Sequence, residues 1–116
     1  MAKQVQNILV NLLHDRQLRD FAKIYLSGRL IDVGCGNKPY QTMVSPYVSS
    51  HVGLDHAETR HELAKVDIVG TAYEIPVADG YFDSALCTSV LEHLEEPELA
   101  IRECYRVLRS GGMAIY

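Results

Sequence analysis

Residues 30–40 hold the side chains best suited to chemistry in this chain. An apolar strand sequence leads into Asp32, and the turn that follows places Gly34 and Gly36 two positions apart. Because glycine has no Cβ, such a turn adopts backbone angles that other residues resist and can approach a bound molecule closely. The Asp32 carboxylate then lies beside that molecule. The spacing predicts a cradle for a nucleotide-type cofactor, although a glycine pair alone is also typical of a turn that binds nothing.

A second carboxylate, Asp55, ends the next strand sequence, 51–55. In an open parallel sheet, ligands bind beyond the carboxyl ends of the strands, near the point where the strand order reverses. We therefore expect Asp32, Asp55 and the residues after Cys87 to lie at one edge of the sheet.

Helix and strand signals alternate along the chain, which means that crossover connections join parallel strands. The apolar spacing predicts an amphipathic helix over 4–26, a short irregular helix over 40–48 and a helix over 97–108 that Ser110-Gly111-Gly112 closes. Strands are expected at 29–33, 51–55, 66–69, 82–87 and 113–116. The predicted fold class is α/β: a Rossmann-like open, mainly parallel sheet with helices on both faces, in one domain (1–116) made of an N-terminal helix (1–28) and a core (29–116).

Composition excludes several classes of protein. The chain has 116 residues, 47% of them hydrophobic and 22% charged, and a net charge of -4, which argues against nucleic acid as the main partner. No apolar stretch is long enough to cross a membrane, and the first residues lack the features of a signal peptide. Three cysteines without metal-ligand spacing fit reduced thiols, so we expect a cytoplasmic protein.

Five segments in order resemble the class I S-adenosylmethionine-dependent methyltransferases, in particular the group that acts on small molecules. The resemblance runs from about Arg29 to the end of the chain. Its segments are Asp32-Val-Gly-Cys-Gly36, Gly53-Leu-Asp55, Ile75-Pro76 through Asp79-Gly-Tyr-Phe-Asp83, Ser89-Val-Leu-Glu-His93 and Arg106-Val-Leu-Arg-Ser-Gly-Gly112. The family fold normally continues past strand five with a further helix and an antiparallel strand pair, so the chain resembles a truncated member.

The resemblance implies a cofactor, S-adenosylmethionine, and a set of residues around it. The turn Gly34-Cys35-Gly36 would pass close to the methionine portion, and Asp32 would orient its ammonium group directly or through water. Asp55 would accept hydrogen bonds from both ribose hydroxyls, a task suited to an ionised carboxylate.

Further residues are assigned to the adenine and to the methionine portion by the same resemblance. His56 would lie against the adenine, and Thr71-Ala72 stands where relatives often have Asp-Ala, so that a hydroxyl replaces the acid. Cys87 and Thr88 would line the methionine pocket through backbone groups.

The turn after the first strand departs from the family pattern, because Lys38 replaces a third glycine. Lys38 is interpreted either as neutralising the cofactor carboxylate or as a solvated loop lysine. Tyr40 is interpreted either as closing over the methionine chain or as packing in the core.

Two other readings of the site residues compete with this one. A nicotinamide-binding domain needs Gly-x-Gly-x-x-Gly opening into a helix, whereas the sixth position here is Pro39 and Asp32 would face phosphates. A metal site is not expected, because Ser89 stands at the first position of the Glu-x-x-Glu-His pattern.

His93 is a candidate general base near the methyl acceptor, with a structural role at a helix start as the alternative. His14, His51 and His61 are assigned no chemistry.

Two functions from different classes remain open. One is methyl transfer from S-adenosylmethionine to a small-molecule acceptor, in which the protein contributes positioning and desolvation. The other is a cofactor-binding or interaction module without turnover. Because the last strand, 113–116, would leave an apolar sheet edge, we also expect a homodimer formed through that edge.

Overall fold

The computed structural model describes residues 15–56, 63–88 and 90–116. Their centre is a five-stranded sheet in which every pairing is parallel. The strands are β1 (Arg29–Val33), β2 (Ser50–Asp55), β3 (Ile68–Val69), β4 (Phe82–Leu86) and β5 (Leu108–Ile115), in the spatial order β3-β2-β1-β4-β5. The order reverses between β1 and β4, which places the switch point beside the glycine turn. The predicted fold class is confirmed.

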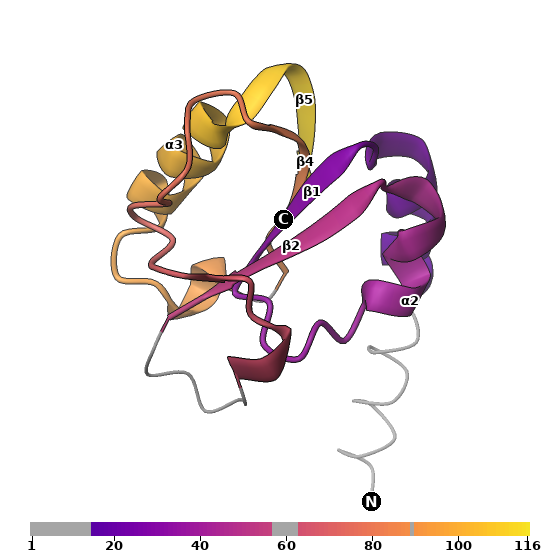
Figure 1. Ribbon diagram of the computed structural model, residues 1–116, viewed down its shortest axis with the longest axis horizontal. Helices are drawn as coiled ribbons and strands as arrows, with labels where there is room; N and C mark the ends of the chain where they lie inside the picture. Colours follow the sequence, from indigo (N-terminus) through magenta and orange to yellow (C-terminus); the bar gives the residue numbers. More distant parts are fainter. Residues whose placement is uncertain (1–14, 57–62, 89) are drawn as a thin grey trace, which may run out of the picture.

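Helices connect and cover these strands (Figure 1). Residues 15–25 are helical, and α2 (Gln41–Val44) and α3 (Pro97–Val107) follow later in the chain. Three single turns of 3-10 helix are η1 (Ser45–Tyr47), η2 (Leu63–Lys65) and η3 (Leu91–His93). Proline stands in the first turn of both η1 and α3, where its missing N–H leaves no helical hydrogen bond unmade.

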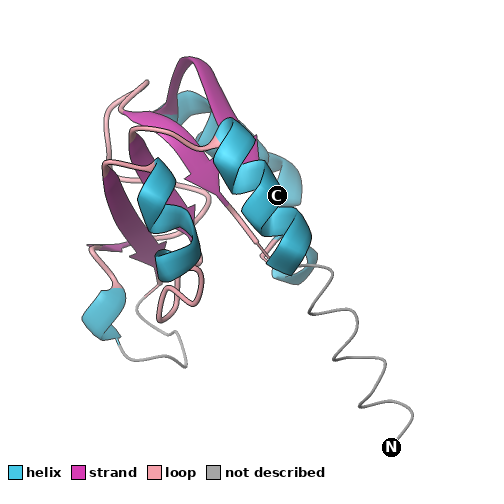
Figure 2. Cartoon of the chain, turned by 90° about the vertical axis from the view of Figure 1, so that its right-hand side faces the viewer, coloured by secondary structure: helices cyan, strands magenta, loops and turns pink. Residues whose placement is uncertain are grey.

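Two hydrophobic clusters lie on opposite faces of the sheet. Ile31 and Val33 of β1 pack on the cluster that includes Cys104 and Val107 of α3, whereas Leu30 belongs to the other cluster. That second cluster is built from the helix at 15–25, α2 and the ends of β4 and β5, with members Leu18, Ala22, Leu26, Leu30, Val44, Leu86 and Ile115. Figure 2 shows helices in front of the strands and behind them. Alternate residues of β1 thus supply both cores, as the period-two geometry of a strand requires.

The C-terminal segment differs from expectation. Ser110-Gly111-Gly112 does not close α3, because the helix ends at Val107 and β5 begins at the next residue. Phe82 pairs with Leu108 but Ser84 pairs with Met113, so the glycine segment is accommodated as an irregularity inside β5. Gly111 has a φ of +79°, which an L residue adopts only with strain.

Other boundaries shift by a few residues. The third strand begins at Ile68 rather than Val66, and the fourth ends at Leu86. The first part of the helix expected over 4–26 falls outside the described residues.

Candidate functional site

The turn after β1 forms the centre of the site. The backbone N–H groups of Gly34 and Cys35 both donate to the carbonyl of Leu54, at 2.8 and 3.1 Å, which fixes the turn against the end of β2. Gly34 has a φ of +72° and Gly36 a φ of +50°. Both values lie in the region that glycine enters without steric cost, so the local sequence permits this path.

Two cavities adjoin this turn on either side of Gly34 and Val90, which line both. The larger, of about 470 Å³, also contains Asp55, His56, Thr71 and Ala72 in its wall, and the smaller, of about 350 Å³, contains Asp32, Cys35, Gly36, Tyr40 and Thr88. A Cβ on Gly34 would come within 2.5 Å of Val90 Cγ2. Glycine at position 34 therefore leaves room where the two cavities meet.

Asp55 is a buried carboxylate at the end of β2 with acceptor capacity to spare. Its Oδ2 accepts the N–H of Gly36 at 2.9 Å, and its Oδ1 accepts the N–H of His56 at 2.8 Å. The residue is 7% exposed. Because an ionised carboxylate can accept about four hydrogen bonds, two positions remain for a ligand in the larger cavity.

Asp32 is held by a residue that the sequence analysis assigned no chemistry. His51 Nε2 lies 2.7 Å from Asp32 Oδ2, and both side chains are 6% exposed. His51 pairs with Leu30 in the register of β1 and β2, and Leu30 precedes Asp32 by two residues. His51 and Asp32 therefore share a face of the sheet, and only this register brings them together.

Lys38 takes neither of the two expected roles. The residue is 9% exposed, and its Nζ donates to the carbonyl of His51 and to Asp67 Oδ2, both at 2.8 Å. Gly53 makes room for this path, because a Cβ there would lie 2.8 Å from Lys38 Cε. The ammonium group is thus committed inside the protein, and Lys38 is not placed to neutralise a ligand carboxylate.

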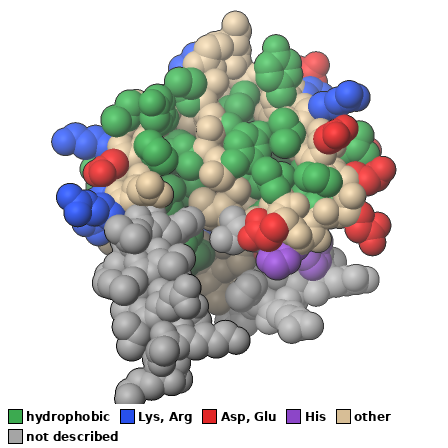
Figure 3. All heavy atoms as spheres, turned by 180° about the vertical axis from the view of Figure 1, so that it is seen from behind, with side chains coloured by type: hydrophobic (Ala, Val, Ile, Leu, Met, Phe, Trp, Pro, Cys, Tyr) green, Lys and Arg blue, Asp and Glu red, His purple; other side chains and the backbone are tan. Residues whose placement is uncertain are grey.

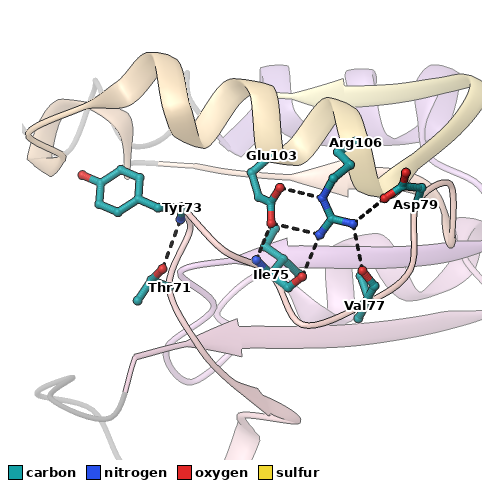
Figure 4. A network of polar contacts seen from close by, with 7 residues as sticks. All are labelled: Thr71, Tyr73, Ile75, Val77, Asp79, Glu103 and Arg106. Atoms are coloured by element: carbon teal, nitrogen blue, oxygen red, sulfur yellow. Dashed lines mark hydrogen bonds and ion pairs between the residues drawn. The ribbon is translucent and has the colours of Figure 1, made fainter.

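The loop that carries Thr71 and Ala72 is fixed by α3 (Figure 4). The Arg106 guanidinium donates to the carbonyls of Ile75 and Val77 at 2.8 and 2.9 Å, and its Nη1 donates to Asp79 Oδ1 at 2.7 Å. Glu103 receives two hydrogen bonds from Arg106, at 2.6 and 2.9 Å, and accepts the N–H of Ile75 at 2.5 Å.

This network joins two of the five segments that carry the family resemblance. Arg106 begins the segment 106–112, and residues 75–79 belong to the segment 75–83. The hydrogen bond from Arg106 holds the pKa of Glu103 below its ordinary value, and the N–H of Ile75 adds to the effect. Thr71 itself accepts the N–H of Tyr73 at 3.3 Å, so its hydroxyl is oriented from within the loop.

The smaller cavity has a negative electrostatic environment. Burial, and next the charge of Asp32, raise the pKa of Cys35 to about 11. Burial also raises the pKa of Tyr40, with Asp15 and Asp32 as further causes. Both groups are therefore neutral at physiological pH, and Asp32 is the only carboxylate among the described residues that line this cavity. Such a wall favours a cationic ligand group.

Two predicted site residues lie outside both cavity walls. Cys87 packs in the cluster beneath α3, and its N–H donates to the carbonyl of Ile115 at 2.9 Å, so that N–H is not available to a ligand. His93 lies on η3 with its side chain 77% exposed and its Nε2 3.8 Å from Glu92 Oε1. Its neighbours Val90 and Leu94 do line the larger cavity.

Sequence reasoning missed His51, Val90, Tyr73 and Leu94, the last three as residues of the cavity walls. Tyr40 both lines the smaller cavity and packs against the second cluster, so its two interpretations are compatible. The register of β1 and β2 was the signal that could have found His51. Gly53 pairs with Asp32, so His51, two residues earlier, lies on the same face of the sheet as Asp32. Val90 lies in the segment Ser89-Val-Leu-Glu-His93 that carries the family resemblance, whereas Tyr73 and Leu94 lie outside the quoted segments.

Among residues 15–56, 63–88 and 90–116, no group of three or more His, Cys, Asp or Glu side chains is arranged to hold a metal ion. No helix of that part of the chain has the length and apolar character needed to span a membrane.

Comparison with known proteins identifies the family. The model of the methyltransferase domain family matches residues 31–116, which contain β2 to β5, all of β1 except its first two residues, and the residues that line both cavities. The chain therefore belongs to the methyltransferase domain family, as the sequence predicts.

Individual relatives agree with this assignment. A probable S-adenosylmethionine-dependent methyltransferase of Mycolicibacterium smegmatis is 31% identical over 90 residues, covering 72% of this chain and 35% of the relative. The YcgJ structure from Bacillus subtilis is 28% identical with a TM-score of 0.68, over 83% of this chain and 46% of that one. A Thermotoga maritima structure described as an S-adenosylmethionine-dependent methyltransferase, possibly acting on histamine, is 26% identical with a TM-score of 0.70, over 97% and 55%.

S-adenosylmethionine, the cofactor expected from the sequence, is thus the cofactor by which such relatives are described. The chain spans less than half the length of the curated relatives that it matches. In three of them the match covers 35%, 42% and 38% of the relative.

Proposed function

We propose that this chain binds S-adenosylmethionine and takes part in methyl transfer to a small-molecule acceptor. The observation that carries the proposal is the pair of adjoining cavities, each with one buried carboxylate in its wall and with Gly34 where they meet. The cofactor has a nucleoside at one end and an amino acid with an ammonium group at the other. The larger cavity offers apolar surface and acceptors for the nucleoside, and the smaller cavity offers a carboxylate for the ammonium group.

The larger cavity suits the nucleoside. The unused acceptor positions of Asp55 match the two ribose hydroxyls, and apolar residues such as Val33, Leu54 and Ala72 offer surface for a planar base. His56 borders the same wall, and the Thr71 hydroxyl stands where it could accept from the adenine amino group.

The smaller cavity suits the methionine portion. Asp32 offers the charge that an ammonium group needs, and the turn over Gly34, Cys35 and Gly36 brings the backbone close. Thr88, through its backbone groups, and Tyr40 complete the wall around the methionine portion, whereas Cys87 supports it from the core beneath. Since Lys38 donates to Asp67 and to the His51 carbonyl, we do not assign it to the cofactor carboxylate.

When bound, S-adenosylmethionine supplies an electrophilic methyl group on a sulfonium ion. The residues of this chain would bind and orient it and exclude water from the two cavities, which is the contribution such displacement reactions need most. We assign proton removal from the acceptor to His93, whose exposed imidazole can reach an acceptor outside the cavities.

The second candidate function is cofactor binding without turnover. The exposure of His93 favours it, because that side chain is 77% exposed and lies outside both cavity walls. The two functions share the binding site and differ only in the acceptor.

Isothermal titration of the purified chain with S-adenosylmethionine and with its product S-adenosylhomocysteine tests the shared claim. We expect binding of both, and a loss of at least about tenfold in affinity for Asp55→Ala. Asp20→Ala, which removes an exposed carboxylate on the helix at 15–25, is the matched control and should bind as the wild type does. Absence of binding by the folded wild type would overturn the proposal.

A transfer assay with methyl-labelled cofactor and a panel of small hydroxyl and amine acceptors separates the two functions. Turnover that falls in His93→Gln at unchanged S-adenosylhomocysteine affinity supports the enzyme. Tight binding with no transfer to any acceptor favours the module without turnover.

Homodimerisation in the cytoplasm completes the proposal. Within the described part of the chain β5 is an edge strand that pairs with β4 alone; Met113 in it and Tyr116 just after it are 45% and 50% exposed. Figure 3 shows a face on which hydrophobic side chains gather in the middle and charged ones lie toward the rim. Sedimentation of a monomer at high micromolar concentration would contradict the dimer.

A further inference from the structure

His51 is an almost fully buried polar residue that belongs to neither cavity wall. Its side chain is 6% exposed, and its Nε2 contacts Asp32 Oδ2 at 2.7 Å. Its Nδ1 is a buried atom without a hydrogen-bond partner among the described residues. Buried polar atoms are rarely left without a partner. The polar contact that accounts for this buried ring is therefore the one from Nε2 to Asp32.

We infer that His51 is a positioning residue that fixes the Asp32 carboxylate for a cationic amine in the smaller cavity. The inference deepens the proposed function, on which it rests, by naming how the ammonium end of the ligand is selected.

The hydrogen-bonding pattern of the ring identifies its form. Nε2 faces a carboxylate oxygen, which accepts only, so Nε2 carries a proton. Nδ1 faces no acceptor within the described part of the chain, and a second N–H there would be buried unpaired. The tautomer assigned from this pattern is the neutral ring protonated at Nε2.

A neutral donor orients Asp32 without cancelling its charge. A lysine or arginine at the same place would form an ion pair and leave the cavity wall uncharged. Lys38, on the turn that follows Asp32, is withheld, because its Nζ donates to Asp67 and to the carbonyl of His51. Asp32 therefore keeps its negative charge for a ligand cation.

His51 is itself fixed from its backbone side. Lys38 Nζ donates to the His51 carbonyl at 2.8 Å, and Asp67 also accepts the N–H of Gly53 at 2.8 Å. The ring thus projects from a strand whose backbone is anchored on both sides of Val52. A carboxylate held by a rigid donor pays less ordering entropy when it binds an ammonium group.

Two ligands distinguish this role from general support of the fold. S-adenosylhomocysteine carries the ammonium group, whereas methylthioadenosine has the same nucleoside and sulfur but no amino acid portion. In His51→Leu we expect S-adenosylhomocysteine affinity to fall about tenfold and methylthioadenosine affinity to stay within about twofold of the wild type. His51→Gln, whose amide can replace the Nε2 donor, should restore most of the difference.

Equal loss for both ligands, or loss for neither, would overturn the inference. Failure of the wild type to bind either ligand would instead count against the proposed function. If His51→Leu does not fold, proton-nitrogen correlation of the histidine rings in the wild type decides the matter. The Nε2 signal of His51 should move when S-adenosylhomocysteine is added and stay in place with methylthioadenosine, and the reverse would contradict the assignment.

Discussion

Lys38 Nζ lies 2.8 Å from Asp67 Oδ2, which joins the turn after β1 to the segment before β3. The lysine side chain is 7% exposed and the aspartate side chain 52%. Burial opposes ionisation of Asp67, but the hydrogen bonds from Gly53 and Lys38 outweigh it and lower the pKa of the carboxyl. The pair anchors the glycine turn, and Lys38 adopts a φ of +52° to reach it.

Removal of either partner should have unequal effects. Asp67→Ala leaves a buried ammonium group whose one remaining partner among the described residues is the His51 carbonyl, so we expect the free energy of unfolding to fall by about 1–3 kcal/mol. Lys38→Met removes the charge and leaves Asp67 half exposed to solvent, and should cost less. Urea denaturation of both variants measures the difference. A larger loss for Lys38→Met would contradict this account of the pair.

Gly34→Ala should impair ligand binding more than folding. The new Cβ would lie 2.5 Å from Val90 Cγ2, where the two cavities meet, and alanine resists a φ of +72°. We expect S-adenosylhomocysteine affinity to fall at least tenfold, roughly 1.4 kcal/mol or more. The double variant Gly34→Ala/Val90→Ala removes the steric contact and should recover part of the affinity in the same titration. No recovery would show that backbone strain alone is responsible.

Arg106→Lys should destabilise the fold although it keeps the charge. The guanidinium serves two carbonyls and two carboxylates at once, and an ammonium group cannot reproduce that planar arrangement. We expect the midpoint of urea denaturation to fall, and by more than in the control variant. Arg109→Lys is the matched control. Arg109 forms an ion pair with Asp83, but its side chain is 48% exposed, so this substitution should cost less than about 1 kcal/mol.

Glu103 should contribute an acid-sensitive part of the stability. Arg106 lowers its pKa from the ordinary value of 4.5. A lowered pKa in the folded state stabilises the protein above the ordinary value, and the contribution is lost as pH falls through the lowered one. The free energy of unfolding should therefore decline between about pH 5 and pH 3 more steeply in the wild type than in Glu103→Gln. Parallel pH profiles of the two proteins would refute this.

Cys35 should react slowly with alkylating reagents although it lines a cavity. Its pKa of about 11, against an ordinary 9.0, lowers the thiolate fraction about a hundredfold near neutral pH, because each unit is a factor of ten. Mass spectrometry after treatment with iodoacetamide at about pH 7.5 should find Cys35 unlabelled under conditions in which the amino acid cysteine, added as a control, reacts. Fast labelling of the folded protein at Cys35 would contradict the electrostatic description of the smaller cavity.

The sequence by itself determined the class of fold and the family. The alternation of strands and helices fixes a parallel sheet, and the motifs around Asp32 and Asp55 lie at strand ends, so their meeting at one edge follows from the topology alone. These features are local patterns or direct consequences of parallel pairing, and for that reason they can be read along the chain.

Tertiary structure alone decided how the site residues are held. The contact of His51 with Asp32 depends on the register of β1 and β2, and the burial of Lys38 depends on space left by Gly53 on a neighbouring strand. The course of Ser110-Gly111-Gly112 inside β5 depends on its pairing with β4. Each of these joins residues distant in sequence through a strand register or a shared volume, and no spacing pattern along one chain carries that information.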